Sequence, residues 1–453
     1  MTTALPERTT PLLSPGYRWA TVGMVSLVFL AAFENLAVTT VMATVAADLD
    51  GRSWFSVAFS ATLAASVVGM VAGGLYADRR GAVPSLLASV GIFVAGLVVA
   101  GVAPGIEIFV AARFLQGLGS GAMTVSLYVL VAHVYEPVDR PRIFGAFAAA
   151  WVLPSMIGPP VAGAVATTVG WRWVFLGVVV LSAAATAALG PALREARATP
   201  VTASTTADGP RRLLLAVAVA AAVVSVDLAA RLSGTPGRVL ALVGVLGALA
   251  AVRPLLPTGS LRARRGLPSV VLLRGLVAAA FSAAEIHVPY LLQTRYDAPP
   301  WLAGLVLTVG ALGWAGASQV QGRMGARLSH VEALRAGSLL LLAGLAAQLV
   351  VVAFQLPAVL VPVAWVAAGA GMGLMYPRIS SYVLGVSAPA ERGTNTAAMS
   401  IGDAVGGATA IAITGLVFTT LGTETWTAFT GVFAATTMIA VLAVVVSRRT
   451  ATP

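Results

Sequence analysis

One glutamate, Glu34, stands near the middle of a long apolar stretch at residues 19–47. A helix of this length exceeds the roughly 30 Å hydrocarbon core of a bilayer, so the stretch predicts a tilted membrane span. A carboxyl group at the bilayer centre costs on the order of 3 kcal/mol, and it therefore faces protein or a wet cavity rather than lipid. Glu34 is either the protonatable centre of a transporter or a structural carboxyl that is hydrogen-bonded to a neighbouring helix.

Arg113, Glu285 and Asp403 also stand inside or close to the edge of apolar segments. A buried guanidinium keeps its charge at any accessible pH, so Arg113 needs an acceptor, and its role is either functional or purely structural. An ionisable residue within a span is a functional hypothesis by default. Glu285 lies nearer the end of its segment, and an interfacial charge is the alternative there.

The other ionisable residues of the apolar segments suggest no metal site. The sequence has no cysteine, and its three histidines lack the spacing of metal ligands. His287 is either a proton relay or a hydrogen-bonded bystander. Asp227 and Arg231 are four residues apart, a spacing that predicts a structural ion pair on one helix face.

The composition indicates which elements must position these residues. Hydrophobic residues make up 58% of the 453 and charged residues only 10%, and the mean hydropathy is +0.91. Soluble domains carry roughly 25% charged residues, so we expect an integral, all-α membrane protein. The net charge of +11 comes from arginines scattered over short loops, which argues against a nucleic-acid partner.

Fourteen apolar segments are candidates for membrane spans. Six precede a polar, Thr-rich linker that begins at residue 194, two follow it as a hairpin, and six close the chain. The predicted units are therefore residues 1–193, a linker with an inserted hairpin at 194–267, and residues 268–453. The linker at 194–212 is too poor in apolar residues for packed structure. The second hairpin segment, 238–252, gives only roughly 22 Å of helix, so twelve spans remain if the hairpin lies in the interface.

The segments as predicted from apolar composition are 19–47, 54–77, 84–103, 107–132, 143–168, 171–192, 213–230, 238–252, 268–293, 300–322, 333–354, 358–386, 394–420 and 426–447. Threading them alternately through a membrane puts twenty arginines on one side and five on the other. Because cytoplasmic loops are enriched in positive residues, both termini are expected in the cytoplasm of a protein of the plasma membrane.

The loop at residues 74–81 reads Gly-Leu-Tyr-Ala-Asp-Arg-Arg-Gly. Its glycines permit a tight turn, and an aspartate beside arginines can dock onto a neighbouring helix end; a solvated turn is the alternative. The loop resembles the G-x-L-a-D-r-x-G-r-k signature of the major facilitator superfamily, although Ala82 and Val83 replace basic residues. The resemblance implies a role in the conformational switch for Gly74, Asp78, Arg79 and Gly81.

Three more motifs of the first half are similar to those of the same superfamily. Residues 113–121 resemble its R-x-x-q-G-x-g motif, in which the arginine takes part in proton coupling and small residues, here Gly117 and Gly121, allow close helix packing. Residues 154–163 resemble the g-x-x-x-G-P-x-x-G-G signature of its proton-coupled antiporters. This resemblance implies that Gly158, Pro159 and Gly163 also take part in the conformational switch. Residues 171–175 are similar to the W-R-W-i-F of the fourteen-helix drug:proton antiporters.

The segment around Glu34 resembles the l-D-x-T-i-V segment of those fourteen-helix antiporters, and Asp403 resembles the acid of their penultimate helix. The resemblance implies the major facilitator fold, with two six-helix bundles and an inserted two-helix hairpin, giving 14 spans or alternatively 12. It also implies proton coupling through Glu34, Arg113 and Asp403. Glu34 would bind a cationic substrate, a proton, or both in turn.

The expected function is proton-coupled efflux of lipophilic, cationic drugs or toxic compounds by alternating access, by a monomer without a cofactor or metal. Glu34 and Glu285 are the expected charged substrate contacts. The expected aromatic contacts, each with ordinary helix packing as its alternative, are Tyr128, Trp151, Phe281, Tyr290, Trp314 and Tyr376. A substrate-specific exporter of a lipid or an endogenous metabolite is the alternative function. The chain contains no phosphate loop and no nucleophile–base arrangement, so an enzyme is not expected.

Overall fold

The computed structural model describes residues 11–136, 139–198, 209–229, 232, 235–324, 327–387 and 392–451. Within these ranges every regular element is helical, and thirteen helical segments are long and apolar enough to cross a membrane. The remaining predicted segment forms α6, an apolar helix of 17 residues. The protein is therefore a multi-pass membrane protein, as its composition predicts.

The first bundle consists of six helices from the first six predicted segments. They are α1 (Arg18–Asp48), α2 (Phe55–Arg80), α3 (Ala82–Gly101), α4 (Ile106–Val134), α5 (Arg140–Thr168) and α6 (Arg172–Ala188). α4 packs against both α2 and α3, and α1 packs against α5. A short helix, α7 (Gly190–Ala198), follows α6 and extends into the segment predicted to lack packed structure. Arg194 and Glu195 are exposed there, while Leu193 is buried.

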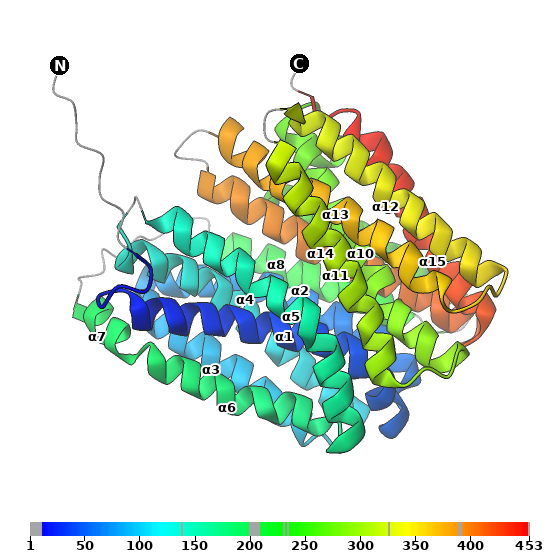
Figure 1. The fold of residues 1–453 in the computed structure, drawn as a ribbon, viewed down its shortest axis with the longest axis horizontal. Helices are drawn as coiled ribbons and strands as arrows, with labels where there is room; N and C mark the ends of the chain where they lie inside the picture. Colours follow the sequence, from blue (N-terminus) through cyan, green and yellow to red (C-terminus); the bar gives the residue numbers. More distant parts are fainter. Residues whose placement is uncertain are drawn as a thin grey trace.

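The second bundle consists of the last six helices. They are α10 (Leu267–Arg295), α11 (Pro300–Met324), α12 (His330–Ala353), α13 (Leu360–Val386), α14 (Arg392–Thr420) and α15 (Trp426–Ser447). α13 packs against α11 and α12, and α10 packs against α14 and α15. Figure 1 shows that the helices of this bundle are inclined to those of the first.

Glycines let helices within each bundle approach closely. A Cβ atom added to Gly117 of α4 would lie 2.1 Å from the Thr62 carbonyl oxygen of α2, and Gly121 meets the next turn of α2 at the same distance. In the second bundle, a Cβ atom on Gly369 of α13 would lie 2.1 Å from the Gly310 carbonyl oxygen of α11. The close packing predicted for Gly117 and Gly121 is thus present, and α11 and α13 use the same device.

The inserted hairpin lies beside both bundles. It consists of α8 (Gly209–Ala229) and α9 (Thr235–Val252), and α8 packs against α2 and α14 (Figure 1). α9 continues through a 3₁₀ turn (Arg253–Leu255), and the combined 21 residues are long enough to span a membrane. Asp227 of α8 is buried and accepts a hydrogen bond from Ser60 of α2. The partner predicted for Asp227, Arg231, lies outside the described residues.

The two ends of the molecule differ in the chain termini that they carry. We call the end of the molecule that holds the first residues of α1 and the last residues of α15 the terminal side, and we call the opposite end the far side. In Figure 1 the start of α1 and the end of α15 lie away from the lower right of the view, where the two bundles come together. Several contacts between the bundles are accordingly found on the far side.

Candidate functional site

Glu34 and Arg113 form an ion pair inside the first bundle. Arg113 of α4 donates from Nη1 to the Glu34 carboxylate of α1 and to the Gln116 side chain, and from Nε to the Ala58 carbonyl oxygen of α2 (3.3 Å). The exposed fractions of the Glu34 and Arg113 side chains are 5% and 1%, so the surrounding helices enclose the pair. A buried arginine needs an acceptor, and the structure shows that the acceptor of Arg113 is Glu34.

The second bundle holds its own ion pair, between Arg274 of α10 and Asp403 of α14. Nε of Arg274 lies 2.8 Å from both carboxylate oxygens, and Nη2 lies 2.7 Å from Oδ2. The guanidinium carbon lies 3.6 Å from the centre of the Tyr376 ring, and the Tyr376 hydroxyl donates to Asp403 (3.4 Å). The side chains of Arg274 and Asp403 are 15% and 26% exposed. Asp403 is thus held by a cation and a phenol but remains partly open to solvent.

Arg274 is absent from the site residues predicted from the sequence. It stands within the apolar segment at 268–293 just as Arg113 stands within 107–132. An arginine in a span needs an acceptor, and this was the signal that would have identified it. Arg274 lies on α10, which also packs against α1 of the first bundle.

The predicted aromatic residues lie in different parts of the molecule. Trp314 and Tyr376 have their ring centres 5.0 Å apart, beside the Arg274–Asp403 pair. Tyr128 is 42% exposed and packs against Phe144, next to it in the first bundle. Trp151 is 47% exposed on α5 and makes no ring contact within the described ranges. The structure therefore groups Trp314 with Tyr376 in the second bundle and Tyr128 with Phe144 in the first.

Tyr290 belongs to a group of contacts that joins the bundles on the far side. Its ring is buried and stacks on Phe55 of α2 at 4.2 Å, and its hydroxyl donates to Glu424 (3.0 Å), which precedes α15. Arg52, between α1 and α2, forms an ion pair with the same carboxylate at 3.1 Å. Gln293 of α10 donates to the carbonyl oxygen of Thr40 in α1 (3.0 Å). Sequence reasoning did not single out Arg52 and Glu424, because both are ordinary loop charges.

The glycine and proline residues predicted for α5 lie against α11. A Cβ atom on Gly163 would lie 2.6 Å from the Cα atom of Trp301, and one on Gly304 of α11 would lie 2.8 Å from the Pro159 carbonyl oxygen. A Cβ atom added to Gly158 would lie 3.4 Å from the Phe33 ring of α1. The motif of α5 is therefore one side of a close contact between the two bundles, in the half of α5 nearer the far side.

The loop that joins α2 to α3 lies on the terminal side. Gly81 ends α2 with φ of 91°, a left-handed conformation that favours glycine. Asp78 and Arg79 are exposed, and Asp78 makes no hydrogen bond within the described part of the chain. Gly74 faces α4, and a Cβ atom added to it would lie 3.6 Å from the Val125 side chain.

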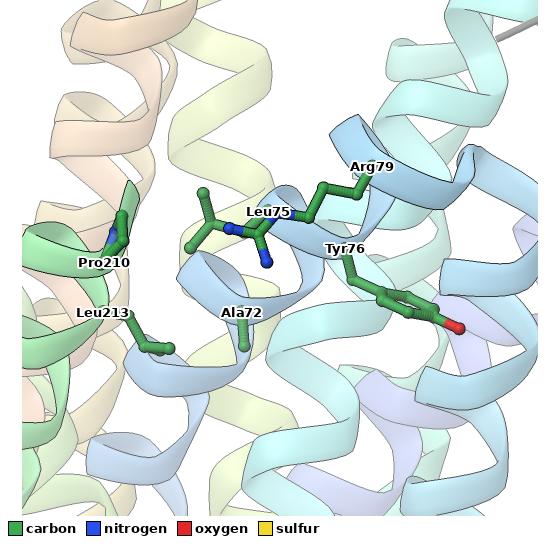
Figure 2. A pocket seen from close by; sticks show the side chains of 6 residues that line it. All are labelled: Ala72, Leu75, Tyr76, Arg79, Pro210 and Leu213. Carbon is green, nitrogen blue, oxygen red and sulfur yellow. The ribbon is translucent and has the colours of Figure 1, made fainter. Parts of the chain in front are cut away.

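A crevice of about 340 Å³ separates this end of α2 from α8. Figure 2 shows the Arg79 side chain extending along Leu75 toward α8, while the Tyr76 ring points away from α8. The lining residues are Ala72, Leu75, Tyr76, Arg79, Pro210 and Leu213. The crevice is mainly apolar and lies outside the region of the two ion pairs.

Glu285 and His287 lie on different faces of α10. Glu285 is partly buried. His287 is fully buried between the rings of Phe55 and Phe418, and its Nδ1 lies 2.7 Å from the Ala283 carbonyl oxygen. No group of three or more acidic or histidine side chains suited to a metal occurs within the described ranges.

Comparison with known proteins gives a family for this arrangement. The family model of the Major Facilitator Superfamily matches residues 24–362. The Methylenomycin A resistance protein of Streptomyces coelicolor is 29% identical over 396 residues, which cover 84% of this chain and 81% of that protein. Multidrug resistance protein 3 of Bacillus subtilis is 25% identical over 167 residues, which cover 37% of this chain and 33% of that protein.

Other relatives match over a shorter part of their length. An uncharacterized MFS-type transporter of Mycobacterium tuberculosis is 34% identical over 185 residues, which cover 39% of this chain and 27% of that protein. An uncharacterized transporter of Schizosaccharomyces pombe is 29% identical over 153 residues, which cover 34% of this chain and 26% of that protein. The chain thus spans only about a quarter of the length of these two relatives.

Solved structures share the fold at low sequence identity. A mutant of the peptide transporter POT in complex with alafosfalin superposes with a TM-score of 0.71 and 16% identity, covering 98% of this chain and 97% of that one. A POT family transporter in complex with 5-aminolevulinic acid gives 0.67 and 16%, covering 95% and 94%. Since the family model covers most of the chain and the helices follow the same fold, the protein belongs to the Major Facilitator Superfamily.

Proposed function

We propose that this transporter exports lipophilic, cationic drugs or toxic compounds across the plasma membrane in exchange for protons. Two relatives, the Methylenomycin A resistance protein and Multidrug resistance protein 3, are resistance proteins by name. The observation that carries the proposal is the pair of carboxylate–guanidinium contacts, one in each bundle, far from the helix ends. A carboxylate in such a place holds a cation or a proton, so the two compete for it.

The proposed mechanism is alternating access between the two bundles. The contacts of Arg52 with Glu424 and of Gly163 with Trp301 support a conformation that is closed on the far side. Opening that side requires these contacts to separate while new ones form on the terminal side. The loop with Gly74, Asp78, Arg79 and Gly81 and the α5 motif with Gly158, Pro159 and Gly163 would control this change.

The proposed direction follows from the distribution of arginines, which puts the terminal side in the cytoplasm. Each proton that enters down the membrane potential contributes about 2.3 kcal/mol per 100 mV, enough to drive cargo outward against a gradient. In this scheme Glu34, Arg113 and Asp403 couple the proton to the conformational change. The proposed cargo contacts are Glu34, Glu285, Tyr128, Trp151, Tyr290, Trp314 and Tyr376, and a monomer suffices.

A substrate-specific exporter is the second candidate. The relative that matches 84% of this chain is named for resistance to a single compound, methylenomycin A. A susceptibility screen of cells that overproduce the protein, with and without a protonophore, separates the two functions. Resistance to several unrelated lipophilic cations that vanishes with the protonophore supports multidrug antiport. Altered export of one compound with otherwise unchanged susceptibility supports the specific exporter.

The central experiment replaces the enclosed carboxylate. Glu34→Gln keeps the size of the side chain but cannot release a proton, so we expect proton-driven efflux in proteoliposomes to fall to the level of empty vesicles. The variant should retain the elution volume of the folded protein in size-exclusion chromatography. Glu107→Gln, which changes an exposed carboxylate at the start of α4, is the matched control. Efflux by Glu34→Gln with the wild-type pH dependence would refute the role of Glu34.

A further inference from the structure

Three acidic residues stand more than one turn from either end of a described helix, and they are Glu34, Glu285 and Asp403. Glu34 is paired with Arg113 and Asp403 with Arg274. Glu285 makes no ion pair and no hydrogen bond with the described part of the chain. In each ion pair the charges of the carboxylate and the guanidinium cancel. Of these three acidic residues, Glu285 is therefore the one that has no positively charged protein partner within the described residues.

Glu285 lies at membrane depth. α10 runs from Leu267 to Arg295, and its midpoint is residue 281, so Glu285 is four residues and roughly 6 Å along the helix from that midpoint. The Glu285 side chain is partly exposed. An ionised carboxylate at this depth requires a compensating positive group, and without one it takes up a proton.

Aromatic rings surround the same part of α10. Phe281, one turn before Glu285, stacks on Trp365 at 4.7 Å and meets the edge of Trp314 at 5.6 Å. Trp314 of α11 in turn contacts Tyr376 of α13, and α10 packs against both of these helices. Trp314 and Tyr376 are both partly exposed, while Trp365 is buried. A lone carboxylate beside partly exposed aromatic faces is the arrangement that binds organic cations.

We propose that Glu285, with Trp314 and Tyr376, forms a site for the positive group of an organic cation, and that this cation and a proton exchange at the Glu285 carboxyl in this conformation. The proposal rests on the function proposed above and assigns its first binding step to the second bundle. Bound cargo compensates the Glu285 charge, and when cargo leaves, a proton replaces it. The Glu34–Arg113 pair, which is enclosed here, then takes part only after the bundles move.

The test uses the purified full-length protein and tetraphenylphosphonium, a permanently charged lipophilic cation that carries no proton. We expect the wild type to release protons into weakly buffered solution when the probe binds, and to bind it at least tenfold more weakly at pH 5 than at pH 8. Glu285→Gln should release no protons and bind weakly at both pH values. Glu107→Gln, which changes an exposed carboxylate, should behave as the wild type.

Two further variants separate this assignment from its rivals. Glu285→Asp keeps the carboxyl and should restore proton release with weaker binding. Glu34→Gln loses transport, but Glu34 is enclosed with Arg113 in this conformation and would meet cargo only after the bundles move, so the variant should still bind the probe here and release protons. If Glu34→Gln loses proton release while Glu285→Gln keeps it, the exchange occurs at Glu34 and the assignment is overturned. A wild type that neither binds the probe nor moves protons overturns the proposed function as well.

A measurement on the wild type alone guards against misfolded variants. Dicyclohexylcarbodiimide adds to protonated carboxyl groups in apolar surroundings, and mass spectrometry identifies the modified residue. We expect modification of Glu285 that decreases at least fivefold when tetraphenylphosphonium is present. Modification of Glu34 alone, or labelling of Glu285 that the probe leaves unchanged, would overturn the proposal.

Discussion

The two bundles hold similar ion pairs in different surroundings. In the first bundle, Glu34 and Arg113 are at most 5% exposed and further hydrogen bonds occupy the guanidinium. In the second, Asp403 is 26% exposed and the Tyr376 ring covers one face of Arg274. Charge alone therefore does not define a working site in a membrane protein. Access decides which pair can meet cargo or protons in a given conformation.

A third pair extends the comparison to the surface. Arg52 and Glu424 join the two bundles on the far side, and their side chains are 57% and 24% exposed. From the Glu34–Arg113 pair through the Asp403–Arg274 pair to the Glu424–Arg52 pair, water takes a growing share in solvating the charges. The cost of removing one member should fall in the same order.

The largest effect is expected for Arg113→Met. Removal of the guanidinium leaves Glu34 enclosed without a counterion, and loss of one partner of a buried pair costs about 3–5 kcal/mol. Denaturant-induced unfolding in detergent measures this loss of free energy of unfolding. Arg335→Met, at an exposed position of α12, is the matched control. A variant as stable as the control would show that Glu34 carries a proton rather than a charge in the enclosed pair.

An intermediate effect is expected for Arg274→Met. Asp403 keeps the Tyr376 hydroxyl and its contact with solvent, so the loss of stability should be about 1–3 kcal/mol. The same unfolding experiment measures it. Substrate binding should change more than stability, because this pair is the accessible one. If Arg274→Met destabilises the protein as much as Arg113→Met does, the difference between the two pairs does not depend on solvent access.

The smallest effect on stability is expected for Arg52→Ala, below about 1 kcal/mol, because exposed ion pairs contribute little. Its effect on conformation should be clearer, since the contact holds the far side closed. A cysteine placed at Ser53 of the cysteine-free protein reports access from that side by its rate of maleimide labelling. We expect Arg52→Ala to raise this rate at least twofold. An unchanged rate would show that the other far-side contacts suffice for closure.

The sequence predicted helices more completely than it predicted contacts. The segment predicted at 19–47 is observed as α1 (Arg18–Asp48), because a run of apolar residues of membrane length has no other stable structure in lipid. A helix that is apolar on all sides does not reveal which face points inward. For this reason the sequence alone could not pair Glu34 with Arg113, 79 residues away, or identify Arg274 as the partner of Asp403.

Local spacing was also an incomplete guide to polar contacts. Asp227 accepts a hydrogen bond from Ser60 of α2, which no local interval in the sequence indicates, and its predicted partner Arg231 lies outside the described residues. Glu285, Trp314 and Tyr376 were each singled out from the sequence. Only the fold shows that the three helices that carry them, α10, α11 and α13, pack against one another.

The hairpin α8–α9 makes the two flanks of this transporter unequal. α2 and α14 contact each other there, and α8 packs against both of them, with Val67, Val219 and Ala404 in one apolar cluster. On the opposite flank α5 packs against α11. A movement that parts α2 from α14 must therefore also shift α8 against at least one of these two helices. A movement that parts α5 from α11 breaks the close contacts of Gly163 and Gly304 instead, so the two flanks need different rearrangements.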